Sequence, residues 1–117
     1  MALRSALINV IFKAASKAAR RMMRDFVEAE NLQVSRKGAA DFVSQADLSA
    51  ERTLKAELEH ARPGWNMILE ETGHIKGASS DAPTWIIDPL DGTTNFLHGI
   101  PHFAISIAVL ENKKLTA

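Results

Sequence analysis

The chain has 117 residues, 14 basic and 14 acidic side chains, a formal net charge of 0 and no cysteine. The absence of cysteine excludes disulfides and thiolate metal sites, and the balanced charge gives no global attraction to nucleic acid or to an anionic membrane. Apolar residues make up 46% of the chain, and no apolar run approaches the roughly 20 residues of a transmembrane helix. These features favour a small cytoplasmic protein without a membrane span.

Residues 3–28 are predicted to form one long helix, because apolar side chains recur every three or four residues along them. No acid precedes Asp25, whereas six bases do: Arg4, Lys13, Lys17, Arg20, Arg21 and Arg24. A solvated helix face explains these bases, but a contact surface for RNA, an acidic partner or a second subunit is an alternative. An acid-free, arginine-bearing start is also typical of mitochondrial transit peptides, which is a further alternative.

A second helix is predicted to begin at Ser44 and to end near Ala61. Ser44 and Asp47 fit a capping box, in which Ser44 is the N-cap and Asp47 is the third helical residue. The helix macrodipole would stabilise the Asp47 carboxylate at that end. Residues 31–40, with a breaker at Gly38, are expected to connect the two helices, and the Arg-Pro-Gly sequence after Ala61 is expected to end the second one.

Met67–Leu69 is a short apolar run that predicts a strand, and Glu70 and Glu71 follow at its end. Adjacent side chains of a strand point to opposite faces, so only one of these two carboxylates is expected to join a given site. Residues 72–83 are polar and contain glycine and serine, which indicates a loop or a loose hairpin.

Trp85–Ile87 has the character of a buried strand, and it is followed by two carboxylates, Asp88 and Asp91. Pro89 has no N–H to offer a sheet, so the strand is expected to end there. Gly92 can adopt a positive φ, and the polar residues after it can open a short helix with free backbone N–H groups. Carboxylates suit hard divalent cations and free N–H groups suit a phosphate, which together favour a metal-dependent phosphate site.

Phe103–Leu110 is a second candidate for a buried strand, and a polar turn then leads into another strand at Leu115. His98 and His102, between the two apolar runs, have the spacing of a helical zinc pair. The glycine and the proline that flank Ile100 argue against an intact helix there, so zinc binding by these histidines is not expected.

Three segments resemble the inositol monophosphatase family of metal-dependent phosphatases. Residues 85–96, WIIDPLDGTTNF, match the family motif W-[IV]-[IV]-D-P-[IL]-D-G-T-[TS]-N-[FY] at every position. Residues 41–47 resemble D-[FL]-V-T-x-x-D, and residues 69–72 resemble G-E-E-[ST], with Leu69 in place of the glycine. The resemblance covers nearly all 117 residues but only the first half of a family member.

The resemblance implies an α+β fold for residues 1–117, in which two helices pack on an antiparallel sheet. This would be the N-terminal portion of the layered αβαβα sugar-phosphatase fold, incomplete without the second domain of the full-length relatives. That second domain supplies a further metal ligand and most contacts to the substrate alcohol, so the 117 residues alone are expected to be weakly active or inactive. The resemblance also implies a homodimer for the complete protein.

The implied activity is the hydrolysis of a small phosphate monoester, such as inositol monophosphate or a related alcohol phosphate. Hard oxygen ligands favour Mg²⁺, with Mn²⁺ as an alternative, and the complete site would hold two or three ions. The expected metal ligands are Glu70, Asp88, Asp91 and the carbonyl of Leu90. Asp47, Glu70 and Thr93 are the expected catalytic residues, with Thr93 donating a hydrogen bond to Asp47. The phosphate is expected on Asp91, Gly92, Thr93 and Thr94.

Two other functions are alternatives. The chain could be a non-catalytic binding module that uses its basic first helix, since some bacterial relatives contact the transcription antitermination machinery. It could also be a sugar-bisphosphate or nucleotide phosphatase of the same superfamily, although the regular spelling of residues 85–96 disfavours this. Lys37 lies near the place where family members carry a lysine that approaches the catalytic site, and an exposed loop lysine explains it as well.

Overall fold

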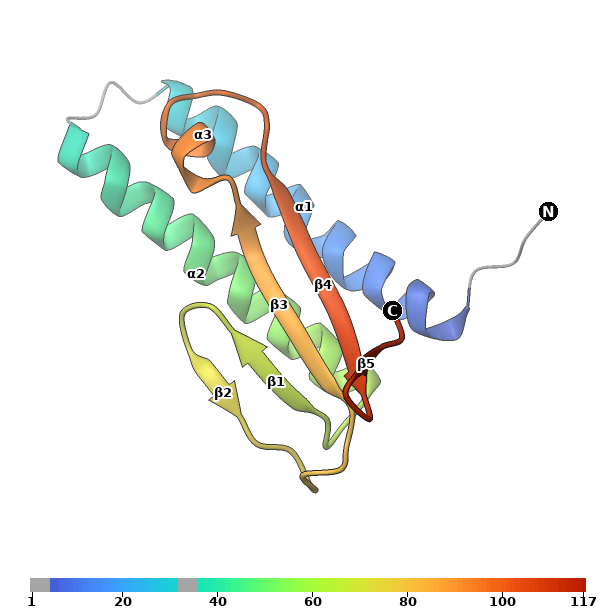
Figure 1. Cartoon of the computed structure of the whole chain (residues 1–117). Coiled ribbons are helices and arrows are strands. Elements are labelled where there is room, and N and C mark those ends of the chain that lie inside the picture. The colour runs from blue at the N-terminus through green and yellow to red at the C-terminus, as the bar shows by residue number, and fades with distance from the viewer. Residues whose placement is uncertain (1–4, 32–35) are drawn as a thin grey trace.

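The computed structural model describes residues 5–31 and 36–117, and in it two long helices cover one face of a five-stranded sheet (Figure 1). The helices are α1 (Ala6–Asn31), α2 (Arg36–Ala61) and the short α3 (Thr93–Leu97). The strands are β1 (Asn66–Leu69), β2 (Gly73–Ile75), β3 (Thr84–Asp91), β4 (Ala104–Glu111) and β5 (Lys114–Leu115). This is the expected α+β class, and none of the described helices is long and apolar enough to cross a membrane.

The sheet is mixed and not purely antiparallel, with the strand order β2-β1-β3-β4-β5. β1 and β3 are parallel, whereas the other three pairs are antiparallel. The reason is that β2 folds back on the outer side of β1, and the chain then returns to the starting end of β1 before β3 begins. Parallel strands end at the same edge of a sheet, so the residues that follow β1 and those at the end of β3 lie close together.

Both long helices begin at residues other than the predicted ones. Ser5 is the N-cap of α1, since its hydroxyl accepts a hydrogen bond from the N–H of Ile8 at 3.1 Å. α2 begins at Arg36, so the capping box predicted at Ser44 is wrong and Gly38 lies within the helix. A glycine costs a helix interior about 1 kcal/mol, which the burial of the apolar face from Val43 onward outweighs.

The larger core cluster lies between the sheet and both long helices. Trp85 is fully buried in it and packs against Trp65, with the ring centroids 5.0 Å apart. Burying one such large side chain contributes about 1.5–3 kcal/mol, so this cluster fixes the strands that carry the acidic residues. Its buried members are Ala14, Ala18, Leu54, Leu58, Met67, Leu69, Trp85, Ile87 and Val109.

A smaller cluster holds α3 against the ends of α1 and α2. The rings of Phe26, Phe96 and Phe103 lie with their centroids 5.0–5.4 Å apart, in tilted or edge-on arrangements. Leu90 belongs to the same cluster and is 2% exposed. Because Leu90 and Phe96 are both buried in this cluster, their packing fixes the positions of the two ends of the segment formed by residues 91–95.

β3 does not end at Pro89, contrary to the prediction. Asp88 pairs with Ser106 and Asp91 pairs with Ala104, so the register between β3 and β4 shifts by one residue and the strand bulges. A bulge tolerates proline, because the extra residue needs no ladder hydrogen bond. The N–H of Leu90 instead donates to Oδ1 of Asp88 at 3.2 Å, which fixes the carboxylate beside its own backbone.

The remaining strands agree closely with the predicted ones. β4 is shifted by one residue from the predicted run, and the 72–83 segment contains the hairpin strand β2. Asn112 and Lys113 both have positive φ, 49° and 63°, as in the tight turns that join two antiparallel strands. β5 pairs with β4 and forms the edge of the sheet, where Leu115 is 70% exposed.

Candidate metal and phosphate site

The parallel pairing of β1 with β3 brings two predicted ligands, Glu70 and Asp88, to one edge of the sheet. Leu69 pairs with Ile87, so the residues that follow them leave their strands side by side. The protonated Glu70 side chain donates a hydrogen bond to the Asp88 carboxylate, and this contact, together with burial and the Asp88 charge, raises the pKa of Glu70 to about 7. Two neighbouring carboxylates repel each other when both are ionised, so one of them keeps its proton up to a higher pH.

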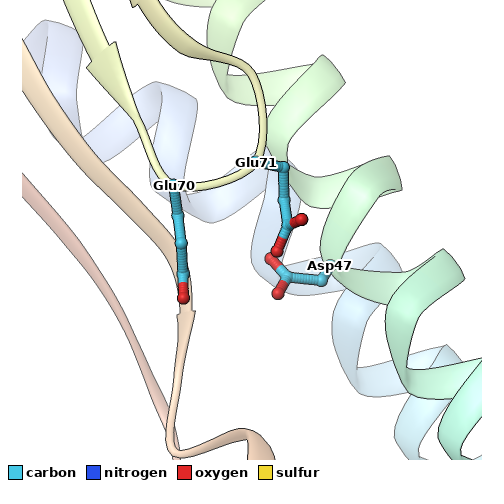
Figure 2. Close-up of side chains that lie close together, drawn as sticks. All are labelled: Asp47, Glu70 and Glu71. Atoms are coloured by element: carbon cyan, nitrogen blue, oxygen red, sulfur yellow. The ribbon is translucent and has the colours of Figure 1, made fainter.

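Helix α2 delivers the third predicted acid, Asp47, to the same edge. Asp47, Glu70 and Glu71 each offer a carboxylate oxygen within 4.8 Å of the others (Figure 2). Figure 2 shows Glu71 turned toward Asp47, while Glu70 points toward the end of β3. The strand alternation behind the expectation that only one glutamate joins the site does not apply, because both follow the last residue of β1 and lie in the turn before β2.

Asp47 is buried, and the charges of the described residues that act most on it are those of other acids. It is 5% exposed, and its Oδ1 has no hydrogen-bond partner among the described residues. Burial is the largest of the causes that raise the pKa of Asp47 to about 6, and the charges of Glu71, Asp88 and Glu51 are the next. A buried carboxylate is costly unless a cation or a donor compensates it, so the cluster has the chemistry of a divalent-cation site made of hard oxygen ligands.

Glu51 is a fourth acid of this region, and the sequence analysis did not identify it. It is 3% exposed on α2, and its carboxylate accepts the N–H of Glu71 at 3.0 Å and the hydroxyl of Thr72 at 2.6 Å. The signal that could have found it is its position four residues after Asp47, which places the two acids on the same face of a helix.

The other predicted ligands lie beyond this carboxylate group. Asp91 is exposed at the end of β3, and it lines a separate hollow of about 480 Å³ together with Asn95 and His102. The side chain of Leu90 is buried in the smaller core cluster, whereas the group of mutually close carboxylates consists of Asp47, Glu70 and Glu71. Asp88 is connected to that group through its hydrogen bond with Glu70.

The predicted phosphate-binding segment forms a sharp turn into α3. Gly92 has φ 93° and ψ 35° and is the residue before the first helical one, as expected. A side chain at this position would be strained, and its Cβ would lie 3.0 Å from the carbonyl oxygen of His102. Thr93 and Thr94 are exposed at the start of α3, where the N–H groups of a helix have no partner within the helix.

Three further expectations have different outcomes. The hydrogen bond predicted from Thr93 does not reach Oδ1 of Asp47, which has no partner among the described residues. The side chain of Lys37 lies outside the described residues. The helix α3 ends at Leu97, so His98 and His102 do not lie on one helix, as the glycine and the proline beside Ile100 indicated.

Comparison with known proteins identifies the family. Residues 3–117 match the inositol monophosphatase family. The chain is 56% identical over 114 residues to an inositol-1-monophosphatase of Mesorhizobium japonicum, covering 97% of this chain and 42% of the relative. It is 43% identical over 103 residues to the Nus factor SuhB of Pseudomonas aeruginosa, covering 87% of this chain and 38% of the relative.

Solved structures agree with the sequence comparison. The crystal structure of the extragenic suppressor protein suhB from Bartonella henselae superposes with a TM-score of 0.81 at 46% identity. The match covers 95% of this chain and 41% of the other. The chain thus spans well under half the length of the relatives that it matches. With matches in sequence and in fold along nearly its whole length, the chain belongs to the inositol monophosphatase family.

Proposed function

We propose that the chain provides the metal- and phosphate-binding part of a divalent-cation-dependent phosphatase that acts on inositol monophosphate or a related small alcohol phosphate. The observation that carries this proposal is the parallel β1–β3 pair, which sets Glu70 beside Asp88 and opposite the buried Asp47. The relative from Mesorhizobium japonicum bears the name of such an enzyme. The structure of 2′AMP-bound SaIMPase-II, which is 25% identical to this chain, favours a nucleotide as the alternative substrate.

The proposed metal ligands are Glu70, Asp88, Asp91 and the carbonyl of Leu90, all of which offer hard oxygen atoms that suit Mg²⁺ and also Mn²⁺. Bound cations would polarise the phosphate oxygens and lower the pKa of a bound water, and a complete site would hold two or three of them. The hydrogen bond from the N–H of Leu90 to Asp88 holds that carboxylate at the end of β3, so the ligand is positioned before any ion arrives.

The other residues would bind the phosphate and manage the proton of the attacking water. The N–H groups of Gly92, Thr93 and Thr94 are proposed to hold the phosphate oxygens, with Asp91 beside them. Asp47, Glu70 and the hydroxyl of Thr93 are proposed to orient the water and accept its proton. The raised pKa values of Asp47 and Glu70 suit this task, since a general base works best with a pKa near the operating pH.

Calorimetric titration of the purified 117-residue chain with Mg²⁺ and with Mn²⁺ tests the proposal. We expect weak binding of one ion that Glu70→Gln lowers about 10-fold or more, because it removes an anionic ligand. Glu59→Gln, which changes an exposed acid of α2 remote from the cluster, is the matched control. Equal affinities of the parent and Glu70→Gln, or no binding by the parent, would overturn the metal site.

A second titration tests the substrate. Inositol monophosphate is expected to bind the chain only when Mg²⁺ is present, and phosphate release is expected to be slow or undetectable. The chain spans 42% of its inositol-1-monophosphatase relative, so it provides only part of the contacts that the whole protein makes. Binding that is unchanged in the presence of a chelator would contradict a metal-dependent phosphate site.

A second candidate function is the binding of an acidic protein surface of the transcription antitermination machinery. The observation that favours it is a groove of about 720 Å³ along α1, lined by Lys17, Arg20, Arg21 and Arg24. Lys17 forms an ion pair with Glu57 at 2.5 Å, whereas the three arginines form no ion pair with the described residues. The SuhB relatives are named as Nus factors, which is consistent with a partner of this kind.

A fluorescence titration with purified antitermination factors, repeated at rising salt, tests this candidate. The double change Arg20→Glu and Arg21→Glu is expected to abolish binding, and the double change Lys113→Glu and Lys114→Glu, at the far edge of the sheet, is the charge-matched control. Binding to an acidic partner should weaken with salt because screening reduces the attraction between exposed charges. Binding that neither the double change nor salt affects would place the partner elsewhere.

A further inference from the structure

We propose that Glu51 is a positioning residue, which ties the turn carrying Glu70 and Glu71 to helix α2. This inference rests on the proposed metal-binding function. The Glu51 carboxylate accepts two hydrogen bonds from that turn, one from the N–H of Glu71 at 3.0 Å and one from the hydroxyl of Thr72 at 2.6 Å. These are the two residues after Glu70, so their anchoring also restrains Glu70.

The burial of Glu51 argues that its role is this contact. The side chain is 3% exposed, between the core residues Ala50 and Leu54 of the same helix. A buried carboxylate without compensating donors is strongly disfavoured, and hydrogen bonds to an ionised acceptor are stronger than neutral ones. An apolar residue would fill the same space, but it would leave the N–H of Glu71 and the hydroxyl of Thr72 without their acceptor.

The turn needs such an anchor because its own side chains are not held by burial in the core. Glu70, Glu71 and Thr72 are exposed, and the β2 strand that follows has three residues at the edge of the sheet. The carboxylates of Asp47, Glu70 and Glu71 repel one another when they are ionised, which pushes the turn away from α2. The bonds to Glu51 oppose this separation, since they join the turn to the helix that carries Asp47.

The closeness of Glu51 to the cluster gives it a second effect. Its charge is among those that raise the pKa of Asp47, so it lies within electrostatic reach of the proposed site. Outer residues that orient metal ligands through hydrogen bonds commonly change metal affinity about 10–100-fold when they are replaced. Glu51 fits that description without being a ligand, because both of its carboxylate oxygens are engaged by the turn.

Thr72 allows a test that leaves the core intact. Thr72→Val keeps the shape of the side chain and removes the donated hydroxyl, whereas Thr72→Ser keeps the donor. We expect Thr72→Val to weaken Mg²⁺ binding about 10-fold and Thr72→Ser to bind like the parent. Thr53→Val is the matched control, since the Thr53 hydroxyl donates to the Ser49 carbonyl within α2 and not to the turn.

Two readouts separate this inference from the metal site itself. The first is the exchange rate of the Glu71 amide hydrogen, measured by NMR without metal, which is expected to rise in Thr72→Val and not in Thr53→Val. The second is a double-mutant cycle for Mg²⁺ affinity between Glu51→Gln and Thr72→Val. Non-additive effects are expected, because both changes act on one contact.

The outcomes are distinguishable. If the parent does not bind Mg²⁺, the proposed function fails, and the amide exchange still decides whether Glu51 anchors the turn. If the parent binds Mg²⁺ but Thr72→Val leaves both affinity and exchange unchanged, the positioning role of Glu51 is overturned. Additive effects in the double-mutant cycle would also overturn it, since the two residues would then act separately.

Discussion

Leu69 and Ile87 are partners in the parallel pair of strands β1 and β3, and each is followed by an acidic residue. This single pairing places Glu70 beside Asp88, although 17 positions separate Leu69 from its partner in the sequence. In an antiparallel pair the end of one strand lies beside the start of the other, so the two acids would lie at opposite edges. The parallel arrangement is therefore what concentrates negative charge at the candidate metal site.

The substitution Asp88→Asn is expected to lower the pKa of Glu70 from about 7 toward the ordinary value of 4.5. The hydrogen bond with Asp88 is the largest cause of the raised value, and removing the charge of Asp88 makes it easier for Glu70 to ionise. An NMR titration of the Glu70 carboxyl carbon in metal-free buffer measures the change. The exposed Asp91→Asn is the control, and an unshifted Glu70 in Asp88→Asn would contradict the contact.

The metal-free chain is expected to lose stability as the pH rises from about 4 to about 7. The pKa values of Asp47 and Glu70 are raised by folding to about 6 and about 7, so in this range the native state binds more protons than the unfolded state. Stability falls with pH wherever the native state holds the extra protons. Thermal unfolding in a chelating buffer should show this slope, and Glu70→Gln should flatten it.

Mg²⁺ is expected to reverse the slope. The ion binds ionised carboxylates, so its binding near pH 6 to 7 should release protons and stabilise the chain most at the higher pH. Calorimetry in two buffers with different ionisation enthalpies measures the released protons directly. A melting temperature that rises with pH in the metal-free chain would contradict the raised pKa values of the acids in the cluster.

Ser44→Ala is expected to leave the stability unchanged or to raise it by up to about 0.5 kcal/mol. Ser44 is exposed inside α2, where alanine is the better helix former. A true N-cap serine would instead cost about 1 kcal/mol on replacement. Ser5→Ala, at the observed N-cap of α1, provides the contrast and is expected to show that loss in urea unfolding. Equal losses for the two changes would restore Ser44 as a cap.

The sequence contained the residues of the candidate site but only part of their arrangement. Apolar periodicity and turn residues were sufficient to predict both long helices, β1, β3 and β4, and the positive φ of Gly92, because these depend on neighbouring residues. The early start of α2 was not predictable in this way. Val43 and Ala46 belong to the same core cluster as Phe96, so this part of α2 is stabilised by distant parts of the chain.

The same distinction explains the other differences. A bulge at Pro89 requires knowledge of the partner strand, since only the shifted pairing with β4 makes the proline acceptable. The roles of Glu71 and Glu51 depend on the contact between the β1–β2 turn and helix α2. A sequence motif for metal ligands does not identify the residues that position those ligands. Local patterns therefore identified candidate ligands, whereas tertiary contacts determine which acids lie together.

Gly92 forms the turn that separates the acidic end of β3 from α3. Gly92→Ala is expected to destabilise the chain by about 1–3 kcal/mol, because its φ of 93° is unfavourable for alanine and the new methyl would lie 3.0 Å from the His102 carbonyl oxygen. Urea unfolding measures the loss. The Cα and Cβ of Phe103, each 3.2 Å from the methyl position, prevent an easy shift.

Gly73→Ala is the control for Gly92→Ala, since it separates backbone strain from steric contact. Gly73 has a similar φ of 84°, but a Cβ there would have no neighbour within 4 Å among the described residues. Its replacement should therefore cost about 1–2 kcal/mol from backbone strain alone, and Gly92→Ala should cost more. Equal losses would mean that residues 102–103 move to accommodate the methyl group. Gly92 would then be required for its positive φ and not for its close contact with residues 102–103.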